Sequence, residues 1–153
     1  MTSPTFAVEP LHAVLPELRP LLPSHWAELA SYPDIPLDPN YDLYLKIADA
    51  GMLTVYTARL NDTLIGYALF FLHAGHMHYR STGWAMNDIV WLHPTHRNLG
   101  IGRDFVAFWD ADLRDRGIDV VHIDTKLVAP ALAHLLGACC YSQITLGFER
   151  RLS

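Results

Sequence analysis

The stretch "HPTHRNLGIG", residues 93–102, has the residue types and spacing of an anion-binding loop. Glycines at positions 100 and 102 carry no Cβ, so a ligand approaches the peptide N–H groups there closely. The stretch lies between an apolar run and a helical pattern, and the free amides and dipole of a helix N-terminus attract anions. We therefore interpret Arg97 to Gly102 as a candidate phosphate loop, with a plain strand-to-helix turn as the alternative.

Two better-known phosphate motifs do not fit this loop. A dinucleotide-binding fingerprint requires a third glycine at position 105, where this chain has Phe105. A Walker loop requires Gly-Lys-Ser/Thr after four spacer residues, and the sequence contains no such run. An anion held by backbone amides at the start of a helix is the remaining interpretation.

Histidine and cysteine residues form two further groups. His73, His76 and His78 lie in "FLHAGHMHYR" without a nearby cysteine or an HExxH spacing, so an exposed hairpin tip is favoured over a pocket wall or a zinc site. We predict no metal. Cys139 and Cys140 are adjacent, and neighbouring cysteines rarely meet disulfide geometry. Reduced thiols favour a cytoplasmic location.

The surrounding pattern predicts the elements that position the loop. Period-two patterns predict strands over 5–9, 84–92 and 118–124, a hairpin over 53–73, and one or two strands over 141–152. Apolar residues at helical spacing predict a proline-interrupted helix over 14–30 and helices over 41–51, 102–117 and 130–137. This order predicts one mixed α+β (mixed α/β) domain over residues 1–153.

The loop and its flanking elements resemble the Gcn5-related N-acetyltransferases, the GNAT superfamily. The central motif of that family is Arg/Gln-x-x-Gly-x-Gly/Ala, preceded by a strand with an apolar end and often a proline. The matching positions here are Leu92, Pro94, Arg97, Gly100 and Gly102. A looser resemblance runs from about Leu53 to the C-terminus, and "PLDPNYDLYL" and "HYRSTGWAMND" resemble GNAT-like proteins of phages and prophages.

This resemblance implies a fold and a co-substrate. The implied fold is a twisted, mostly antiparallel sheet with one splayed strand pair, flanked by about four helices. The co-substrate is acetyl-CoA, whose pyrophosphate is bound by backbone amides and whose pantetheine arm pairs with the strand before the loop. The residues implied for the pyrophosphate are Arg97, Asn98, Leu99, Gly100, Ile101 and Gly102, and those for pantetheine are Val90, Trp91 and Leu92.

The resemblance also implies a catalytic base, Asp88. It lies nine residues before Arg97, which matches an acidic position common in the strand of the family. Strand alternation predicts that Asp88 shares a face with Val90 and Leu92, unless a β-bulge intervenes. The structural alternative is that Asp88 caps a turn or pairs with an arginine such as Arg80.

The chain departs from the family at the general acid. Many GNAT enzymes have a tyrosine four residues before a Gly-Phe pair, and it protonates the CoA thiolate. The corresponding position in this chain is Leu136. Tyr141, Tyr79 or water are the candidate replacements. A catalytically weak GNAT-fold protein that binds acyl-CoA or a partner protein in a regulatory role is therefore the alternative to an enzyme.

The acceptor and the partners are constrained by composition. Asp34, Asp38 and Asp42 lie with tyrosines in or beside a proline-rich loop, which suits a cationic primary amine on a small molecule or a protein. The net charge of -5 argues against nucleic acid as a partner. No apolar run approaches the ~18 residues of a membrane span. The family resemblance leaves a homodimer open.

Overall fold

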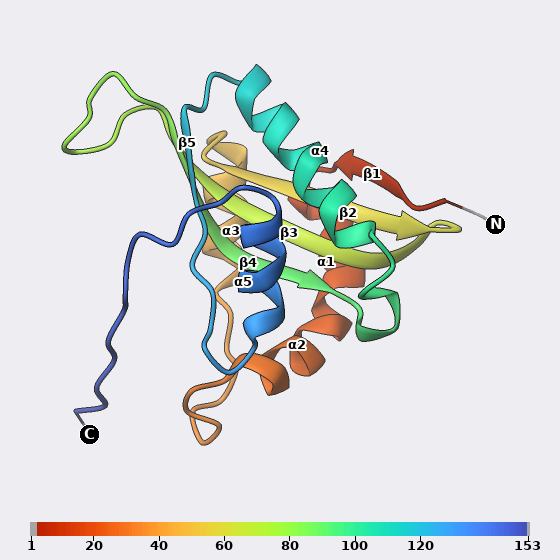
Figure 1. The fold of residues 1–153 in the computed structure, drawn as a ribbon. Coiled ribbons are helices and arrows are strands. Elements are labelled where there is room, and N and C mark those ends of the chain that lie inside the picture. Colours follow the sequence, from red (N-terminus) through yellow and green to blue (C-terminus); the bar gives the residue numbers. More distant parts are fainter. Residues whose placement is uncertain (1–2, 153) are drawn as a thin grey trace.

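A computed structural model describes residues 3–152, and their strands form one five-stranded sheet (Figure 1). The strands are β1 (Thr5–Val8), β2 (Leu53–Leu60), β3 (Thr63–His73), β4 (Trp84–Leu92) and β5 (Val120–His122). They lie in numerical order across the sheet, and every neighbouring pair is antiparallel except β4 and β5. This mixed, mostly antiparallel sheet confirms the predicted fold class.

The β2–β3 hairpin forms where the sequence predicts it. Asn61 and Asp62 make the turn with φ angles of 50° and 64°. Asparagine and aspartate tolerate this left-handed region, and two such residues in a row match the right-handed twist of the strands they join. Turn and alternation therefore agree, and the pairing runs the length of β2.

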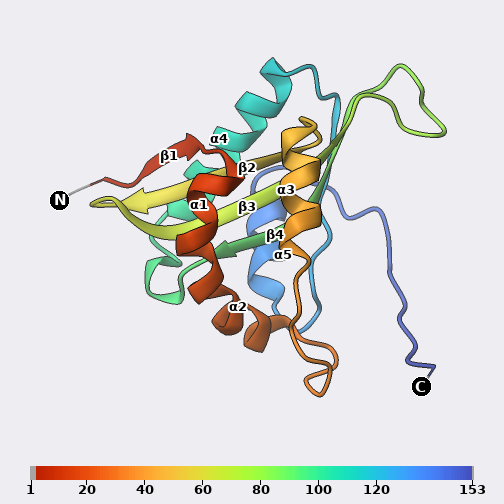
Figure 2. The same cartoon turned by 180° about the vertical axis from the view of Figure 1, so that it is seen from behind.

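The helices are α1 (Leu11–Leu18), α2 (Leu22–Leu29), α3 (Tyr41–Asp49), α4 (Ile101–Asp115) and α5 (Pro130–Ala138), with short 3-10 turns at Arg19–Leu21 and Pro94–His96. Helices α1, α2 and α3 cover one face of the sheet, and α4 and α5 cover the other (Figures 1 and 2). The segment predicted to be interrupted by prolines is divided at Pro20, because proline lacks the N–H that a continuous helix uses.

Two hydrophobic cores lie on the two faces of the sheet. Phe70 packs with Phe105 and Trp109 against α4, whereas the neighbouring Leu69 packs with Val14 against α1. Successive side chains of a strand point to opposite faces, so β3 supplies both cores. A sheet buried on both sides holds β4, the strand next to the predicted loop, in a fixed position.

The C-terminal segment differs from the prediction. Residues 141–152 form no strand in the structure, although their apolar residues alternate. Ile144, Leu146 and Phe148 are 71%, 72% and 93% exposed, and the segment leads away from the sheet (Figure 1). A strand needs a partner ladder as well as alternation, and here no ladder forms. The predicted C-terminal strand is therefore wrong for this chain as described.

Candidate active site

Strands β4 and β5 separate after a short parallel contact. They pair only at Trp84 to Met86, opposite Val120 to His122. At the next position the side chain of Asn87 reaches across, where its Nδ2 donates to the Asp124 carbonyl at 3.2 Å and its Oδ1 accepts the Asp124 N–H at 2.7 Å. A side chain thus replaces the backbone ladder at the point where the strands part. The result is the splayed strand pair that the sequence predicts.

The far half of β4 presents an open backbone edge to this gap. The His93 amide donates to the Ile65 carbonyl of β3 at 2.7 Å, and Trp91 stands opposite Tyr67 in the same register. Hydrogen-bonding directions alternate along a strand, so the peptide groups of Val90 and Leu92 point toward the gap. The peptide of Trp91 points toward β3 instead. Two of the three predicted pantetheine-pairing residues therefore lie on the open edge.

The glycine loop beyond β4 has the backbone of an anion cradle. Asn98 and Gly100 adopt φ angles of 63° and 82°. Within residues 3–152, the amides of residues 98–102 donate to no acceptor. Left-handed residues turn the neighbouring N–H groups away from the usual helical or strand direction, and the 15-residue helix α4 begins there at Ile101. Free amides at the start of a helix are what an anion-binding loop requires.

The side chain of Arg97 serves the fold rather than the cradle. Its Nε donates to the Leu92 carbonyl at 2.8 Å, and its Nη2 donates to both Glu28 oxygens at 3.0 and 2.8 Å. Glu28 also accepts from the Trp91 indole at 3.1 Å. Burial raises the pKa of Glu28, but the indole and the guanidinium outweigh it and lower that pKa. Sequence inspection missed Glu28, because 69 residues separate it from Arg97.

Asp88 lies at a β-bulge in β4. Leu69 of β3 pairs with Ile89 and Phe70 pairs with Asn87, so Asp88 has no register partner. The side chain of Asp88 accepts a hydrogen bond of 2.8 Å from the hydroxyl of Tyr44, on α3. The bulge shifts the alternation by one residue, so Asp88 faces α3 while Val90 and Leu92 pack in the other core, and the shared face expected without a bulge does not form.

The environment of Asp88 favours its protonated form. Burial raises the pKa of this carboxyl, and the hydrogen bond from Tyr44 partly offsets the rise. Burial and the neighbouring carboxylate also raise the pKa of the Tyr44 hydroxyl. A carboxylate with a raised pKa holds a proton more readily, which is what a base near neutral pH requires. The alternative partner, Arg80, makes no contact with Asp88 in the described part of the chain.

The candidate general acids lie in three different settings. Leu136, at the family position for tyrosine, lies on α5 and is buried in the core that includes residues of α4. Tyr141 donates its hydroxyl to Asp110 on α4 at 2.5 Å. Tyr79 is exposed in the β3–β4 loop and stacks on Trp84. The hydroxyl of Tyr141 is therefore already committed to another carboxylate.

His73, His76 and His78 lie near Trp84, at the opposite end of β4 from the glycine loop. His76 and His78 belong to the β3–β4 loop rather than to a strand, and the ring of His76 packs at a tilt against Trp84, with 4.7 Å between centroids. In residues 3–152, no three His, Cys, Asp or Glu side chains gather around a point where a metal ion would fit. Cys139 and Cys140 are free thiols.

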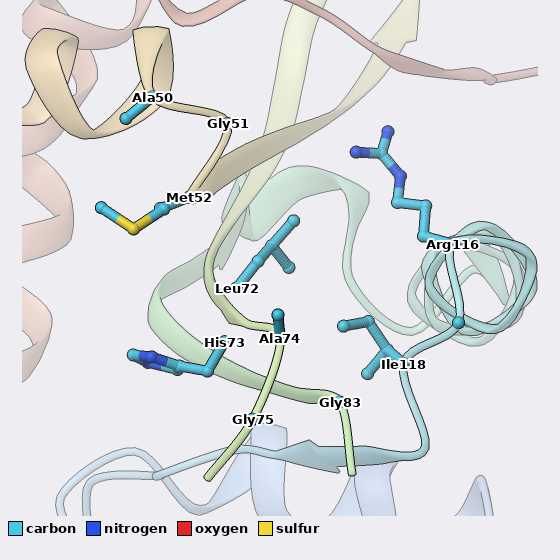
Figure 3. A pocket seen from close by; sticks show the side chains of 11 residues that line it. Ala50, Gly51, Met52, Leu72, His73, Ala74, Gly75, Gly83, Arg116 and Ile118 are labelled. Atoms are coloured by element: carbon cyan, nitrogen blue, oxygen red, sulfur yellow. The ribbon is translucent and has the colours of Figure 1, made fainter. Parts of the chain in front are cut away.

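A hollow of about 580 Å³ lies beside His73 (Figure 3). It adjoins the end of β3 and the start of β4, whereas the glycine loop follows the other end of β4. Its side chains include Met52, Leu72 and Ile118, and much of the remaining lining is glycine. It contains neither Asp88 nor any residue of the predicted cradle. The predicted site therefore lies along β4 and the start of α4, not in this hollow.

Comparison with known proteins agrees with the geometry. A model of the Acetyltransferase (GNAT) family matches residues 14–138, which include the splayed strands, Asp88 and the glycine loop. The chain belongs to the GNAT family. This GNAT chain is accordingly an acyltransferase that depends on acetyl-CoA. No curated protein sequence matches it significantly. Among the described residues, no helix has the length and apolar character needed to cross a bilayer.

Solved structures share the fold at low sequence identity. An aminoglycoside acetyltransferase from an uncultured soil metagenomic sample, in complex with sisomicin, has a TM-score of 0.76 at 13% identity, covering 98% of this chain and 97% of its own. A ribosomal-protein-alanine N-acetyltransferase from Brucella melitensis biovar Abortus 2308 has 0.73 at 17%, covering 99% and 100%. A predicted acetyltransferase with acetyl-CoA from Clostridium acetobutylicum has 0.70 at 11%, covering 98% and 97%.

Proposed function

We propose that this GNAT chain, with residues 1–153 as one domain, transfers an acetyl group from acetyl-CoA to a primary amine by direct attack in a ternary complex. The observation that carries the proposal is the run of unpartnered amides at residues 98–102, at the positive end of α4 and beside the open edge of β4. That run suits a pyrophosphate. The peptide groups of Val90 and Leu92 suit the amides of pantetheine, although Arg97 already occupies the Leu92 carbonyl.

Asp88 is the proposed base. The amine nitrogen attacks the thioester carbonyl carbon, a C–N bond forms, and the C–S bond breaks with its electron pair leaving on sulfur. The proton lost from nitrogen passes to Asp88, directly or through a water molecule. The half-buried setting and raised pKa of this carboxyl support that role. The thiolate takes its proton from water, since Tyr141 donates its hydroxyl to Asp110.

The acceptor class is proposed from charge. Tyr41 and Tyr44 begin the helix that follows the proline-rich loop, and that loop carries Asp34 and Asp38. Carboxylates and aromatic rings together favour a cationic amine. The relatives named for aminoglycosides and for ribosomal-protein alanine both act on amines, which supports the same class. A cytoplasmic location remains a prediction from the two free thiols.

The test separates binding from turnover. We expect calorimetry with acetyl-CoA to show saturable heat, and thiol release from acetyl-CoA to appear with at least one amine of a panel. The panel should contain an aminoglycoside, a linear polyamine and a peptide with an N-terminal alanine. No heat at millimolar acetyl-CoA would refute the cradle. Tight binding without thiol release on any amine would favour the regulatory alternative.

A further inference from the structure

The hydrogen bond between Tyr44 and Asp88 joins two residues that lie 44 positions apart in the sequence. It connects α3, which packs on the sheet, to the bulge in β4. The side chain of Asn40 accepts the Leu43 amide at 3.1 Å, so the first turn of α3 is capped beside Tyr44. The Tyr44 ring stacks on Phe71 with 6.2 Å between centroids. The hydroxyl is therefore held in place by its helix and by its ring.

Within residues 3–152, burial and the Tyr44 hydroxyl are what shift the pKa of Asp88, and no charged side chain contributes. The β3 residues beside the bulge are Leu69 and Phe70, which are uncharged. Across the gap, His122 and Asp124 contact each other at 3.2 Å, and the backbone of Asp124 is bound by Asn87. On α3, Tyr41 contributes to the raised pKa of Tyr44 and lies under the guanidinium of Arg19. Within residues 3–152, the Asp88 side chain accepts its hydrogen bond from Tyr44.

We propose that Tyr44 is the positioning residue of this reaction: its hydroxyl holds Oδ2 of Asp88, so that Oδ1 is the oxygen that takes the proton of the acceptor amine. The inference rests on the proposed role of Asp88 as base. A carboxylate with one oxygen fixed keeps its plane and presents a single free oxygen, which lowers the cost of ordering the proton-transfer geometry. Donation to the ionised form also keeps Asp88 available as a base at lower pH, against the effect of burial.

The variant Tyr44→Phe removes only the hydroxyl and keeps the ring that packs on Phe71. A hydrogen bond to a carboxylate favours its charged form, so losing this bond raises the pKa of Asp88. We expect the acid limb of kcat/KM to move up by about one pH unit, so that kcat/KM at pH values below this limb falls about tenfold. Acetyl-CoA affinity should stay within about twofold of the unaltered protein, because Tyr44 lies outside the cradle.

A matched control is available on the other face of the sheet. The hydroxyl of Tyr56 donates to Asp112 on α4 at 2.7 Å, so Tyr56→Phe removes the same kind of bond away from Asp88. The pH profile of kcat/KM should be the same in Tyr56→Phe as in the unaltered protein. A Tyr44→Phe profile that coincides with the unaltered protein, or a shift of equal size in Tyr56→Phe, would overturn the inference.

A second measurement does not depend on turnover. The side-chain carboxyl carbon of Asp88, assigned with Asp88→Asn, can be titrated by NMR in the free protein and in Tyr44→Phe. An upward shift of its midpoint in Tyr44→Phe supports the inference even if no amine of the panel is acetylated, so failure of the proposed function is recognised separately. An unchanged midpoint refutes the inference whatever the activity.

Discussion

His25 is a buried histidine, 4% exposed, on the face of the sheet opposite α4. Its Nδ1 lies 2.9 Å from the Tyr67 hydroxyl, and its Nε2 has no partner among the described residues. Burial lowers the pKa of His25 to about 4, with Arg97 adding to the decrease and Glu28 opposing it. The folded protein therefore keeps this imidazole neutral at a pH where an unfolded chain would charge it.

This burial predicts an acid-sensitive stability. The folded pKa lies below the unfolded value of about 6.5, so the unfolded state binds more protons between these values. The contribution of neutral His25 to the free energy of unfolding should be complete above pH ~6.5. It should fall by up to about 3 kcal/mol as the pH drops to 4. Chemical denaturation across this range measures it. In His25→Gln the same fall should be smaller, and an equal fall in both proteins would contradict the assignment to His25.

Asp88, as the proposed base, should contribute directly to kcat. If it accepts the proton of the amine, Asp88→Asn should lower kcat by about 10²-fold or more, since general bases contribute in that range. Steady-state thiol release gives this value. Asp110→Asn is the matched control, because Asp110 is a half-buried carboxylate that also accepts from a tyrosine. An unchanged kcat in Asp88→Asn across the pH range would remove this residue from the mechanism.

Some residues of the candidate site are predictable from the sequence and others are not. The spacing of Arg97, Gly100 and Gly102 predicts the loop, because its requirements are local. The identity of Asp88 is also predictable, but its direction depends on a bulge formed against β3. Tyr44 and Asn87 act on partners 44 and 37 positions away, and nothing local marks them. Long-range pairing therefore decides the part of the site that the sequence leaves open.

At the scale of elements, the junction of β4 and α4 depends on one glycine. Gly100 has a φ of 82°, and an added Cβ there would meet no atom within 4 Å. Gly100→Ala would therefore cause no steric clash, but holding an alanine in the left-handed region costs roughly 1–2 kcal/mol. We expect the loop to relax and its amides to lose their common direction. Acetyl-CoA affinity, measured by calorimetry, should fall about tenfold or more.

Gly137 provides the control for this substitution. It lies in α5, its φ is not in the left-handed region, and an added Cβ would again meet nothing within 4 Å. Gly137→Ala should leave acetyl-CoA affinity unchanged and stabilise the protein by up to about 1 kcal/mol, because alanine is the better helix former. Equal loss of affinity in both variants would show that the conformation of Gly100 is not what the ligand needs.

The elements also show where alternation alone is an insufficient guide. Apolar residues alternate along both 53–73 and 141–152. Only residues 53–73 form a ladder, because a two-residue turn brings the two halves of that segment together. The C-terminal segment would have to pair with a distant strand edge. Local pattern predicts which segments are able to form strands, whereas the partner decides which do so.

At the scale of the whole molecule, the family match ends at residue 138 and the exposed tail lies beyond it. Ile144, Leu146 and Phe148 are spaced to form one apolar face in an extended chain. Exposed alternating segments next to an edge strand such as β5 favour association between chains. We predict that the full chain is a dimer by sedimentation and that deleting residues 142–153 makes it monomeric with little change in unfolding free energy.

A point variant sharpens this prediction. Phe148→Glu should weaken the dimer, whereas Met77→Glu, at an equally exposed position in the β3–β4 loop, should not. A monomeric full chain would contradict the prediction. Hydrogen exchange then shows whether the tail amides are protected, as they would be if the tail paired with its own β5 edge.

The bridge from Asn87 to Asp124 has a consequence for the way in which acetyl-CoA would bind. Because the side-chain amide of Asn87 satisfies both the N–H and the carbonyl of Asp124, these two groups are not available to extend the ladder between β4 and β5. The gap between β4 and β5 is thus preorganised, so the binding of acetyl-CoA does not have to separate the two strands. Acetyl-CoA should accordingly enter without a slow rearrangement, with an observed association rate that rises linearly with its concentration.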